Sequence, residues 1–469
     1  MSPVVAMLIG IAVLLVLVIV TKIQAFPALI LSAIVIGLCA GFTPADTIAA
    51  VTTGFGNTMA SIGIVIGLGC IMGLFMERSG AAKKMALTIL KMVGIKKADI
   101  VIGLTGFLVS IPVFCDSGFV ILSSLAKEFS RLTKKSMILI GGLLGMGLYI
   151  THFLVPPTPG PLAVAGAFGI DVGLFILAGL ALSVPLFIFA VWFFRMISKT
   201  VPSIIPERDE ADLKKLSPAQ REVLAKIEAK QASGQELVTS DFNELLKDET
   251  LPGAGISFAT LLIPVILILV RSICVSVVGV TGPLASALDM VGLPVPAIFI
   301  SVLMSIYILA RKLNKDECLD VIEKAIASAG LIVFVTAAGG SLGNVIRVTN
   351  AGNIMAEAII NSSLPIIAVP LLVGTLLRFP QGSGTVAMVT GSAILAPMLP
   401  TLGINPVIAG LALCTTAMCP SYMNDSYFWV VTRFSGFPVK TSLRTWSLST
   451  IAVPAVGSII LIIVNAIFF

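Results

Sequence analysis

The sequence contains little charge, a single histidine and no paired cysteine motif. Only 12% of its 469 residues are charged, about half the share usual in soluble domains. The seven cysteines are scattered and form no CxxC pair, so a structural zinc site or a disulfide framework is not expected. One histidine is too few for a metal cluster. We therefore expect neither a metal site nor a cofactor.

Apolar residues dominate instead. They make up 57% of the chain, the mean hydropathy is +1.08, and the apolar runs are about 18–25 residues long. Since one helical span takes about 20 residues, the chain has room for about a dozen membrane elements. The net charge of +6 is spread between the apolar runs, which fits the positive-inside rule better than nucleic-acid binding. These features indicate an all-α polytopic membrane protein and exclude a soluble enzyme.

The first apolar run, residues 1–21, could be read as a signal peptide. Its start, MSPVVAML, lacks a cation, and no small-residue cleavage site precedes Lys22. We interpret it as a retained membrane helix.

Charge is concentrated in one segment. Residues 207–249 hold 18 of the 54 charged residues, and 217–232 has a helical pattern. We predict a cytoplasmic connector at 201–255, which is either a plain linker or a regulatory or partner-binding site.

The parts on either side of the connector look related. Residues 67–86 align without gaps on 337–356, with five identities that include Gly69/Gly339 and Gly73/Gly343. Further along, 115–120 falls opposite 381–386, and Gly169 falls opposite Gly436. We predict a first membrane repeat at 1–200 and a second at 256–469.

The positions of basic residues indicate that the two repeats cross the membrane in opposite directions. In the first two pairs of aligned segments, the segment of the first repeat is rich in Lys and Arg and that of the second repeat has none. In the third pair, the segment of the second repeat is the basic one. The pairs are 78–97 and 348–364, 127–135 and 391–405, and 169–175 and 433–444. Because basic loops mark the cytoplasm, this predicts an inverted repeat, which is typical of secondary transporters.

The predicted topology follows from these constraints, with the N-terminus outside. Each repeat contains helices, a cytoplasmic or external re-entrant hairpin, and a helix broken near its middle. Simple helices are expected at 3–21, 27–43, 58–77, 173–195, 256–278, 293–310, 327–347 and 446–468, hairpins near 98–126 and 365–390, and broken helices near 137–168 and 405–432.

Two acidic residues fall inside these irregular elements. Asp116 lies in IPVFCDSGFV and Asp425 in SYMNDSYFW, whereas most other acids lie in the connector, in loops or near helix ends. A charge at membrane depth is costly and marks a functional site. Either carboxyl group could carry a proton, or it could simply cap a helix.

A basic residue stands just before the second hairpin tip. Arg378 could bind a carboxylate in a bidentate manner, with Ser383 and Thr385 as hydroxyl donors, or it could satisfy loop carbonyls. His152 precedes the interruption PPTPGP and is a weaker candidate for proton transfer or a packing residue. Thr158 is a candidate ligand within that interruption, although threonine also bonds helix carbonyls.

Long motifs in these elements resemble the gluconate permease family, the gluconate:proton symporters of the ion transporter superfamily. The resemblance covers nearly the whole chain outside the connector. The matching segments are GFGNTMASIGIVIGLGCIMGLFMERSGAA (54–82), IPVFCDSGFVILSSLAKEFSR (111–131), THFLVPPTPGPLAVAGAFGID (151–171), LLRFPQGSGTVAM (376–388), MNDSYFWVV (423–431) and VKTSLRTW (439–446).

The resemblance implies uptake of gluconate or a related small hydroxy-carboxylate with protons. It also implies a homodimer in the bacterial inner membrane, in which a transport domain moves like an elevator against a scaffold. The site would lie at the two hairpin tips and the two helix breaks. Its residues would be Ser117, Gly118, Thr158, Gly160, Arg378, Gln381, Ser383, Thr385, Asn424 and Ser426, with Asp116, Asp425 and His152 for proton coupling.

The chain departs from the family pattern at two aromatic positions. Many relatives read SHVNDSGFW where this chain has SYMNDSYFW, so Tyr422 replaces His and Tyr427 replaces Gly. These tyrosines leave open other sugar acids, glycerate-like acids and D-serine as substrates.

Three other functions are weighed against proton symport. Sodium coupling would use backbone and hydroxyl oxygens at the hairpin tips. A cation channel fits inverted repeats with broken helices less well than alternating access does. We do not expect an enzyme, because no nucleophile–base–orienter set is evident.

Overall fold

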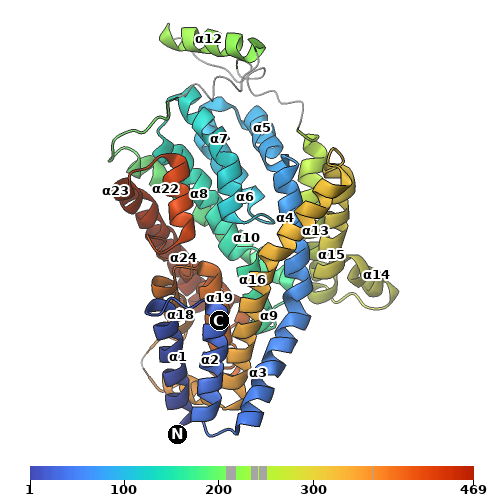
Figure 1. Ribbon diagram of the computed structural model, residues 1–469, viewed down its shortest axis with the longest axis vertical. Helices are drawn as coiled ribbons and strands as arrows, with labels where there is room; N and C mark the ends of the chain where they lie inside the picture. Colours follow the sequence, from blue (N-terminus) through green and yellow to red (C-terminus); the bar gives the residue numbers. More distant parts are fainter. Residues whose placement is uncertain (208–217, 234–240, 242–250, 363, 469) are drawn as a thin grey trace.

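The computed structural model describes residues 1–207, 218–233, 241, 251–362 and 364–468, and the protein in this part of the chain is helical throughout. The molecule is elongated, with the N-terminus near one end and α12 (Pro218–Ala232) beyond the helices at the other end (Figure 1). This confirms the prediction of an all-α protein.

The bounds of the helices before the connector are as follows. They are α1 (Pro3–Ile19), α2 (Ala25–Cys39), α3 (Pro44–Thr58), η1 (Met59–Gly63), α4 (Ile64–Arg78), α5 (Ala81–Val93), η2 (Ile95–Lys97), α6 (Ala98–Val109), α7 (Cys115–Thr133), α8 (Met137–Leu154), α9 (Pro159–Phe168) and α10 (Val172–Ile197).

The bounds of the helices after residue 250 follow. They are α13 (Ala254–Arg271), η4 (Ser272–Val277), α14 (Pro283–Gly292), α15 (Pro294–Met304), η5 (Ser305–Leu309), α16 (Lys315–Val348), α17 (Ala351–Ile360), α18 (Ala368–Gln381), α19 (Gly384–Leu395), α20 (Leu399–Leu402), α21 (Pro406–Thr416), α22 (Ser426–Ser435), α23 (Val439–Ser442), η6 (Leu443–Ser447) and α24 (Leu448–Phe468).

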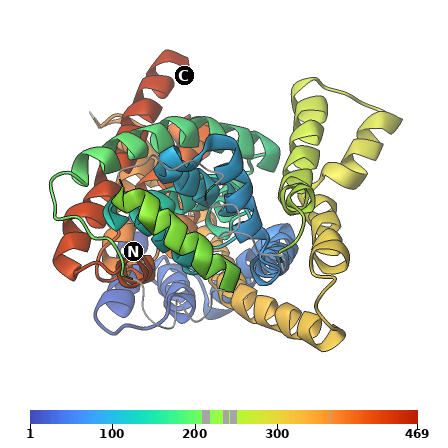
Figure 2. The same cartoon turned by 90° about the horizontal axis from the view of Figure 1, so that it is seen from above.

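Six of the helices in the described residues are long and apolar enough to cross a membrane, or seven if α14 and α15 with η5 form one bent span. In the view from above, α13, α14 and α15 project to one side of the main bundle (Figure 2). Arg271 lies within the predicted span 256–278. Its side chain forms ion pairs of 2.8 Å with both Asp171 and Asp289, so its charge is compensated.

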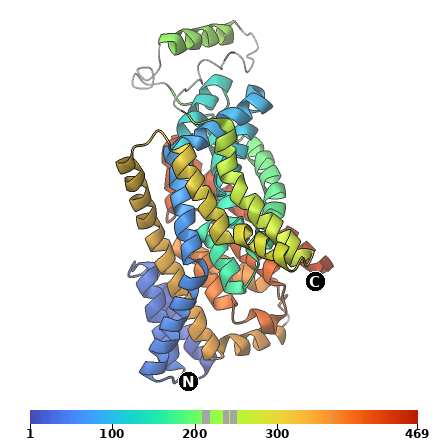
Figure 3. The same ribbon diagram turned by 90° about the vertical axis from the view of Figure 1, so that its right-hand side faces the viewer.

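Two long helices cross next to each other and begin earlier than the sequence predicted. The first runs unbroken from Pro44 to Arg78 through α3, η1 and α4, and the second is α16 (Figure 3). The predicted starts were 58 and 327. The Thr43 side chain caps the first helix at Asp46, and Asn314 with Glu317 forms a capping box on the second. Because the first turns of both helices are polar, hydropathy along the sequence did not show where the helices begin.

The basic segment 78–97, predicted as a loop, contains the amphipathic helix α5. Its apolar face is buried through residues such as Met85 and Leu90, while its lysines stay outside the core. Its charge pattern led the sequence argument to a loop, although a one-sided apolar stripe also fits an interfacial helix.

Four helices are interrupted in the middle of the molecule. The interruptions lie between α6 and α7, α8 and α9, α18 and α19, and α21 and α22. The pair α8 and α9 forms the centre of the bundle, with 94% of its most apolar window buried. Close packing here depends on small residues: a side-chain carbon on Gly147 would lie 2.1 Å from the Gly103 carbonyl oxygen of α6.

A buried acid ties the helix ends near the connector together. Asp99, in the first turn of α6, accepts hydrogen bonds from Lys135 at 2.5 Å and from the Arg195 guanidinium at 2.8 and 2.9 Å. Its side chain is only 1% exposed, although the sequence had assigned it to a loop. It therefore fixes the ends of α6, α8 and α10 relative to one another.

Candidate functional site

A buried ion pair links the second hairpin to the last broken helix. Arg378, in the last turn of α18, is fully buried, and its Nη2 donates to Asp425 Oδ2 at 2.6 Å. The same atom donates to the Tyr149 hydroxyl of α8 at 3.1 Å. Because Asp425 is 5% exposed, both charges are removed from solvent and neutralise each other.

Further hydrogen bonds hold the Asp425 carboxylate in place. It accepts from the Ser421 hydroxyl and from the Tyr427 backbone N–H, and as the N-cap of α22 it satisfies an otherwise unpaired donor of that helix. The Trp446 indole N–H donates to Ser421 Oγ at 2.9 Å. The chain between α21 and α22 is therefore fixed by a polar network inside the protein.

Several polar atoms next to this network have no partner. Arg378 Nε and Nη1 are buried and form no hydrogen bond with any described residue, and the same holds for both side-chain amide atoms of Gln381. Unsatisfied buried donors are costly, and a guanidinium presents its donors in a geometry that matches a carboxylate. These atoms are the ones that an anionic ligand at the second hairpin tip would satisfy.

The other predicted acid is arranged differently. Asp116, in the first turn of α7, accepts a 3.4 Å hydrogen bond from the Ser426 hydroxyl and a weaker one from the Cys115 thiol. It forms no ion pair with a described cation, in contrast to Asp425. Its neighbour Ser117 lies next to Glu77, near the end of α4.

Four helix N-termini meet around this cluster. Those of α7 and α22 meet through Asp116 and Ser426. Those of α9 and α19 pack closely, since a side-chain carbon on Gly160 would lie 2.0 Å from Met388 Cε. The tip before α19 also contacts the break before α22, because Gly382 lies against the Asn424 backbone. Helix N-termini carry partial positive charge and attract anions.

The remaining predicted residues are found in more ordinary surroundings. Thr158 stands at the N-cap position of α9, but its hydroxyl donates to the Val155 carbonyl at 2.6 Å and does not cap the helix. His152 is 6% exposed, packs against Phe114 and Phe153, and its Nδ1 has no partner among the described residues. Asn424 donates to the Phe379 carbonyl at 2.9 Å.

The last three predicted residues lie at the hairpin tips. Ser383 caps α19, Thr385 is partly exposed in its first turn, and Gly118 packs against Leu148 of α8. Small residues at these tips allow the helix starts to approach each other.

The two tyrosines that depart from the family pattern contact protein residues next to the site. Tyr427 is buried, stacks on Tyr149 with ring centroids 5.4 Å apart, and donates to the Gly145 carbonyl. Tyr422 stacks on Phe379 and donates to its carbonyl at 2.8 Å. One rigidifies the core and the other joins the break before α22 to α18.

Sequence analysis missed Tyr149, Ser421, Trp446 and Glu77. Tyr149 lies in an apolar run where nothing in the local pattern distinguishes it from a packing residue, whereas Ser421 and Trp446 lie in the segments SYMNDSYFW and VKTSLRTW, already named for Asp425 and for the family resemblance. Glu77 could have been found, because its acid falls at the end of a conspicuous glycine-rich helix.

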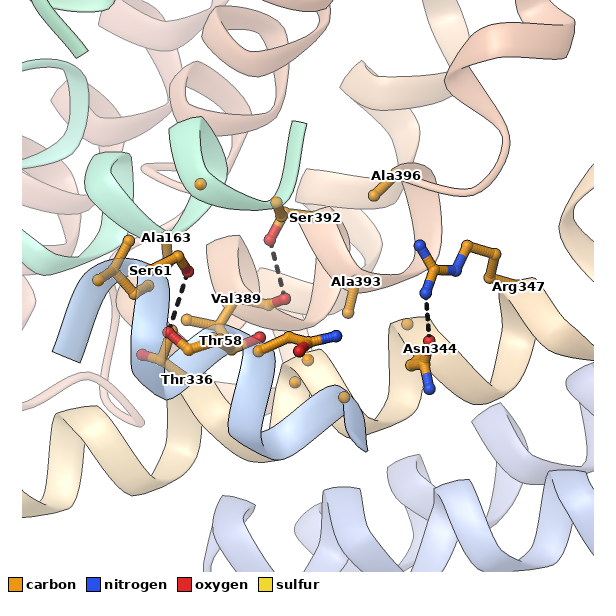
Figure 4. Close-up of a pocket in the computed structure, with 18 of the residues that line it drawn as sticks. Thr58, Ser61, Ala163, Thr336, Asn344, Arg347, Val389, Ser392, Ala393 and Ala396 are labelled. Atoms are coloured by element: carbon orange, nitrogen blue, oxygen red, sulfur yellow. Dashed lines mark hydrogen bonds between the residues drawn. The ribbon is translucent and has the colours of Figure 1, made fainter. Parts of the chain in front are cut away.

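A separate cavity, which we call the outer pocket, has a volume of about 370 Å³ and lies between α3, η1, α9, α16 and α19 (Figure 4). None of the site residues predicted from the sequence lines it. Its wall contains the side chains of Thr58, Ser61, Asn344 and Arg347.

The comparisons with known proteins cover the whole chain. The model of the GntP family permeases matches residues 2–467. An uncharacterized permease of Haemophilus influenzae is 38% identical over 99% of this chain and 93% of its own length. A gluconate permease of Pseudomonas aeruginosa is 28% identical over 95% and 93%, and a D-serine transporter of Escherichia coli is 28% identical over 92% and 90%.

A solved structure shares the fold. Neisseria gonorrhoeae MtrF, described as illuminating a class of antimetabolite efflux pumps, superposes with a TM-score of 0.59 at 15% identity, over 88% of this chain and 84% of its own. The family match confirms the resemblance found in the motifs and agrees with a transporter rather than an enzyme. The chain belongs to the GntP family of permeases.

Proposed function

We propose that this permease imports gluconate or a related small sugar acid with protons across the bacterial inner membrane. The observation that carries the proposal is the meeting of four helix N-termini next to the unpartnered Nε and Nη1 of Arg378. Helix dipoles and a guanidinium together favour a small carboxylate over a neutral or cationic solute. The polar tip residues Gln381, Ser383 and Thr385 would bind its hydroxyl groups.

The substrate class stays broader than gluconate. Relatives of similar identity are named as gluconate and D-serine transporters, and both solutes carry a carboxylate and a hydroxyl group. The same arrangement would accept glycerate-like acids. We propose sodium coupling only as the alternative to proton coupling, and a cation channel as the remote one.

Proton coupling is proposed for Asp116 rather than Asp425. Asp425 is balanced by Arg378, so protonating it would break a buried ion pair. Asp116 has no cationic partner among the described residues, and an unpaired charge is costly inside a membrane protein. Its protonation would thus favour movement of the loaded carrier. We expect Asp116→Asn to abolish accumulation driven by a pH gradient and to retain substrate exchange. Normal accumulation in this variant would contradict the assignment.

We also propose that the two halves, 1–200 and 256–469, are inverted repeats. Support comes from matching backbone turns at aligned positions. Gly80 and Asn350 both adopt the left-handed conformation between consecutive helices, with φ of 75° and 59°. Gly169 and Gly436 do the same after α9 and α22, with φ of 66° and 71°.

The two halves differ in how each hairpin lies along its long helix. Ser117 contacts Glu77, at the end of α4. In the second half, Gly339 packs on Val389, so Ser383, six residues before Val389, lies level with position 333 of α16. Position 333 corresponds to position 63 of the first half. In first-half numbering, the first hairpin tip therefore lies beside position 77 of its long helix and the second beside position 63. The two positions differ by about 14 residues, which is about 20 Å at 1.5 Å per residue.

Such an offset is what we expect if the hairpins and broken helices move as a unit along the long helices. If each hairpin took the position along its long helix that the other hairpin has here, Ser383 would lie next to Arg347, the counterpart of Glu77. In a background without native cysteines, Glu77→Cys with Ser117→Cys should cross-link in the conformation described here. Arg347→Cys with Ser383→Cys should cross-link in the exchanged one. Failure of the second pair under all substrate and pH conditions would contradict elevator movement.

The test of function is uptake of labelled gluconate into proteoliposomes, with either a pH gradient or a sodium gradient imposed. Accumulation driven by the pH gradient alone supports the proposal. Accumulation that needs sodium supports the alternative, and saturable uptake argues against a channel. If folded protein takes up gluconate in neither gradient, gluconate is excluded, and D-serine and glycerate are tested in the same way.

The proposal includes a homodimer. Large apolar side chains on the projecting helices α13 to α15 and on η5 are exposed in the single chain, among them Phe299 of α15 and Tyr307 of η5. A lipid bilayer or a second copy could cover them. The mass of the protein in detergent micelles distinguishes a dimer from a monomer.

A further inference from the structure

The outer pocket carries a group of polar side chains in a molecule that is mostly apolar. Seven polar side chains line it: Asn57, Thr58, Ser61, Thr336, Asn344, Arg347 and Ser392. Its volume of about 370 Å³ lies within the range of about 300–1,000 Å³ typical of small-molecule sites. A second cavity shares Ala167 and Ala396 with it and continues toward the loop after α19.

The outer pocket lies on the side of the central cluster away from the connector. It is lined by the later turns of α9 and α19, whereas the central cluster lies at the first turns of those helices. Close contacts of Met388 with Gly160 and of Val389 with Gly339 separate the two spaces in this conformation. With the connector in the cytoplasm, the outer pocket faces the outside.

Arg347 is the one charged residue on the described wall of this pocket. Its Nη2 donates to Asn344 Oδ1 at 2.6 Å (Figure 4). Asn344 in turn donates to the Ala50 carbonyl at 2.7 Å. The amide thus orients the guanidinium without neutralising it. Among the described residues, no acidic side chain forms an ion pair with Arg347, and no acid lines the pocket. Its remaining donors can bind a carboxylate.

The aligned position in the first half carries the opposite charge. Arg347 corresponds to Glu77 in the alignment of 67–86 with 337–356. Glu77 lies beside the first hairpin tip, at the end of α4 that is near the connector. The long helices therefore present a cation near the outside and an acid near the cytoplasm, which favours capture of an anion on one side and its release on the other.

We propose that the outer pocket is the first binding site for the carboxylate of the substrate, and that Arg347 is the cation that binds it before the hairpins move. This inference rests on the proposed import of a small acid. Electrostatic attraction at such a site raises the association rate and depends on ionic strength. Arg347 is then a specificity-determining residue on the outer path, distinct from the buried Arg378.

Uptake kinetics test the role of the charge. We expect Arg347→Gln to raise the KM for external substrate about tenfold, as loss of one charged hydrogen bond does, with the maximal rate retained. Uptake should also lose most of its dependence on ionic strength, and Arg347→Lys should be intermediate. Arg311→Gln removes an exposed cation near the opposite end and should behave like the wild type. A wild-type KM and salt dependence in Arg347→Gln would overturn the proposal.

A binding measurement separates this inference from the proposed function. Ser61 is an exposed residue on the pocket wall, so Ser61→Cys, in a background without native cysteines, reports on occupancy through a membrane-impermeant thiol reagent added outside. Gluconate should slow the labelling when Arg347 is present and not in Arg347→Gln. Arg347-dependent protection without any uptake would overturn the proposed function but support gluconate binding in the outer pocket. Uptake without Arg347-dependent protection would overturn the proposed binding in the outer pocket but support the proposed import of a small acid.

Discussion

The ion pair between Arg378 and Asp425 offers the sharpest test of how the central cluster is held together. Asp425→Asn preserves the volume and removes the charge, and it also replaces one of the two acceptor oxygens, which bind the Tyr427 N–H and the Ser421 hydroxyl, by an NH2 group. Arg378 would then be a fully buried cation with a neutral hydroxyl, that of Tyr149, as its remaining partner. Removing one partner of a buried pair costs about 3–5 kcal/mol, so we expect a loss of unfolding free energy in that range.

A double-mutant cycle isolates the pair itself. Arg378→Met should destabilise by a similar amount, because it strands the carboxylate. The loss of unfolding free energy in the double variant should be smaller, by about 2–3 kcal/mol, than the sum of the losses in the two single variants. Tyr149→Phe is the control: it removes no charge, but it removes the hydrogen bonds to Arg378 and to the Met418 carbonyl, and it should cost about 1–3 kcal/mol. The measurement is the free energy of unfolding in mixed micelles as a function of denaturing detergent.

Two results would refute this reasoning. Losses below about 1 kcal/mol for both single variants would mean that the charges are solvated, and strict additivity in the double variant would mean that they do not interact. Transport adds a second criterion. If Arg378 also binds the carboxylate, the double variant should regain stability and remain inactive.

Three further variants test other contacts. Asp99→Asn should lower the free energy of unfolding by about 1–3 kcal/mol, measured in the same detergent titration, because Lys135 and Arg195 lose their shared anion. Gly382→Ala should abolish uptake at normal expression, because this residue has φ of +69° and a side-chain carbon would lie 2.2 Å from the Asn424 carbonyl oxygen. Tyr427→Phe should cost about 1 kcal/mol through the lost bond to Gly145 and leave the KM unchanged; a large rise in KM would mean that the tyrosine contacts substrate.

Local composition carries much of the fold. Clustered proline and glycine residues in apolar runs mark the interruptions near Pro112, Pro157 and Gly382, which could be predicted from the sequence, although α10, α13 and α24 each continue through a single proline. The family could be predicted as well, because motifs such as IPVFCDSGFV are long enough to be specific. The long helices were placed too late in the chain, because their polar first turns at Pro44 and Lys315 have low hydropathy.

What the sequence alone determined is therefore the membrane class, the family and the acids and cations that stand out in apolar surroundings. Only the tertiary structure decided their partners. It pairs Asp425 with Arg378, leaves Asp116 without a described cation, and brings Tyr149 and Trp446 to the cluster from helices far away in the chain. Spacing along a chain predicts neighbours within one or two helical turns. Contacts between residues hundreds of positions apart, such as Tyr149 and Arg378, depend on how whole helices pack.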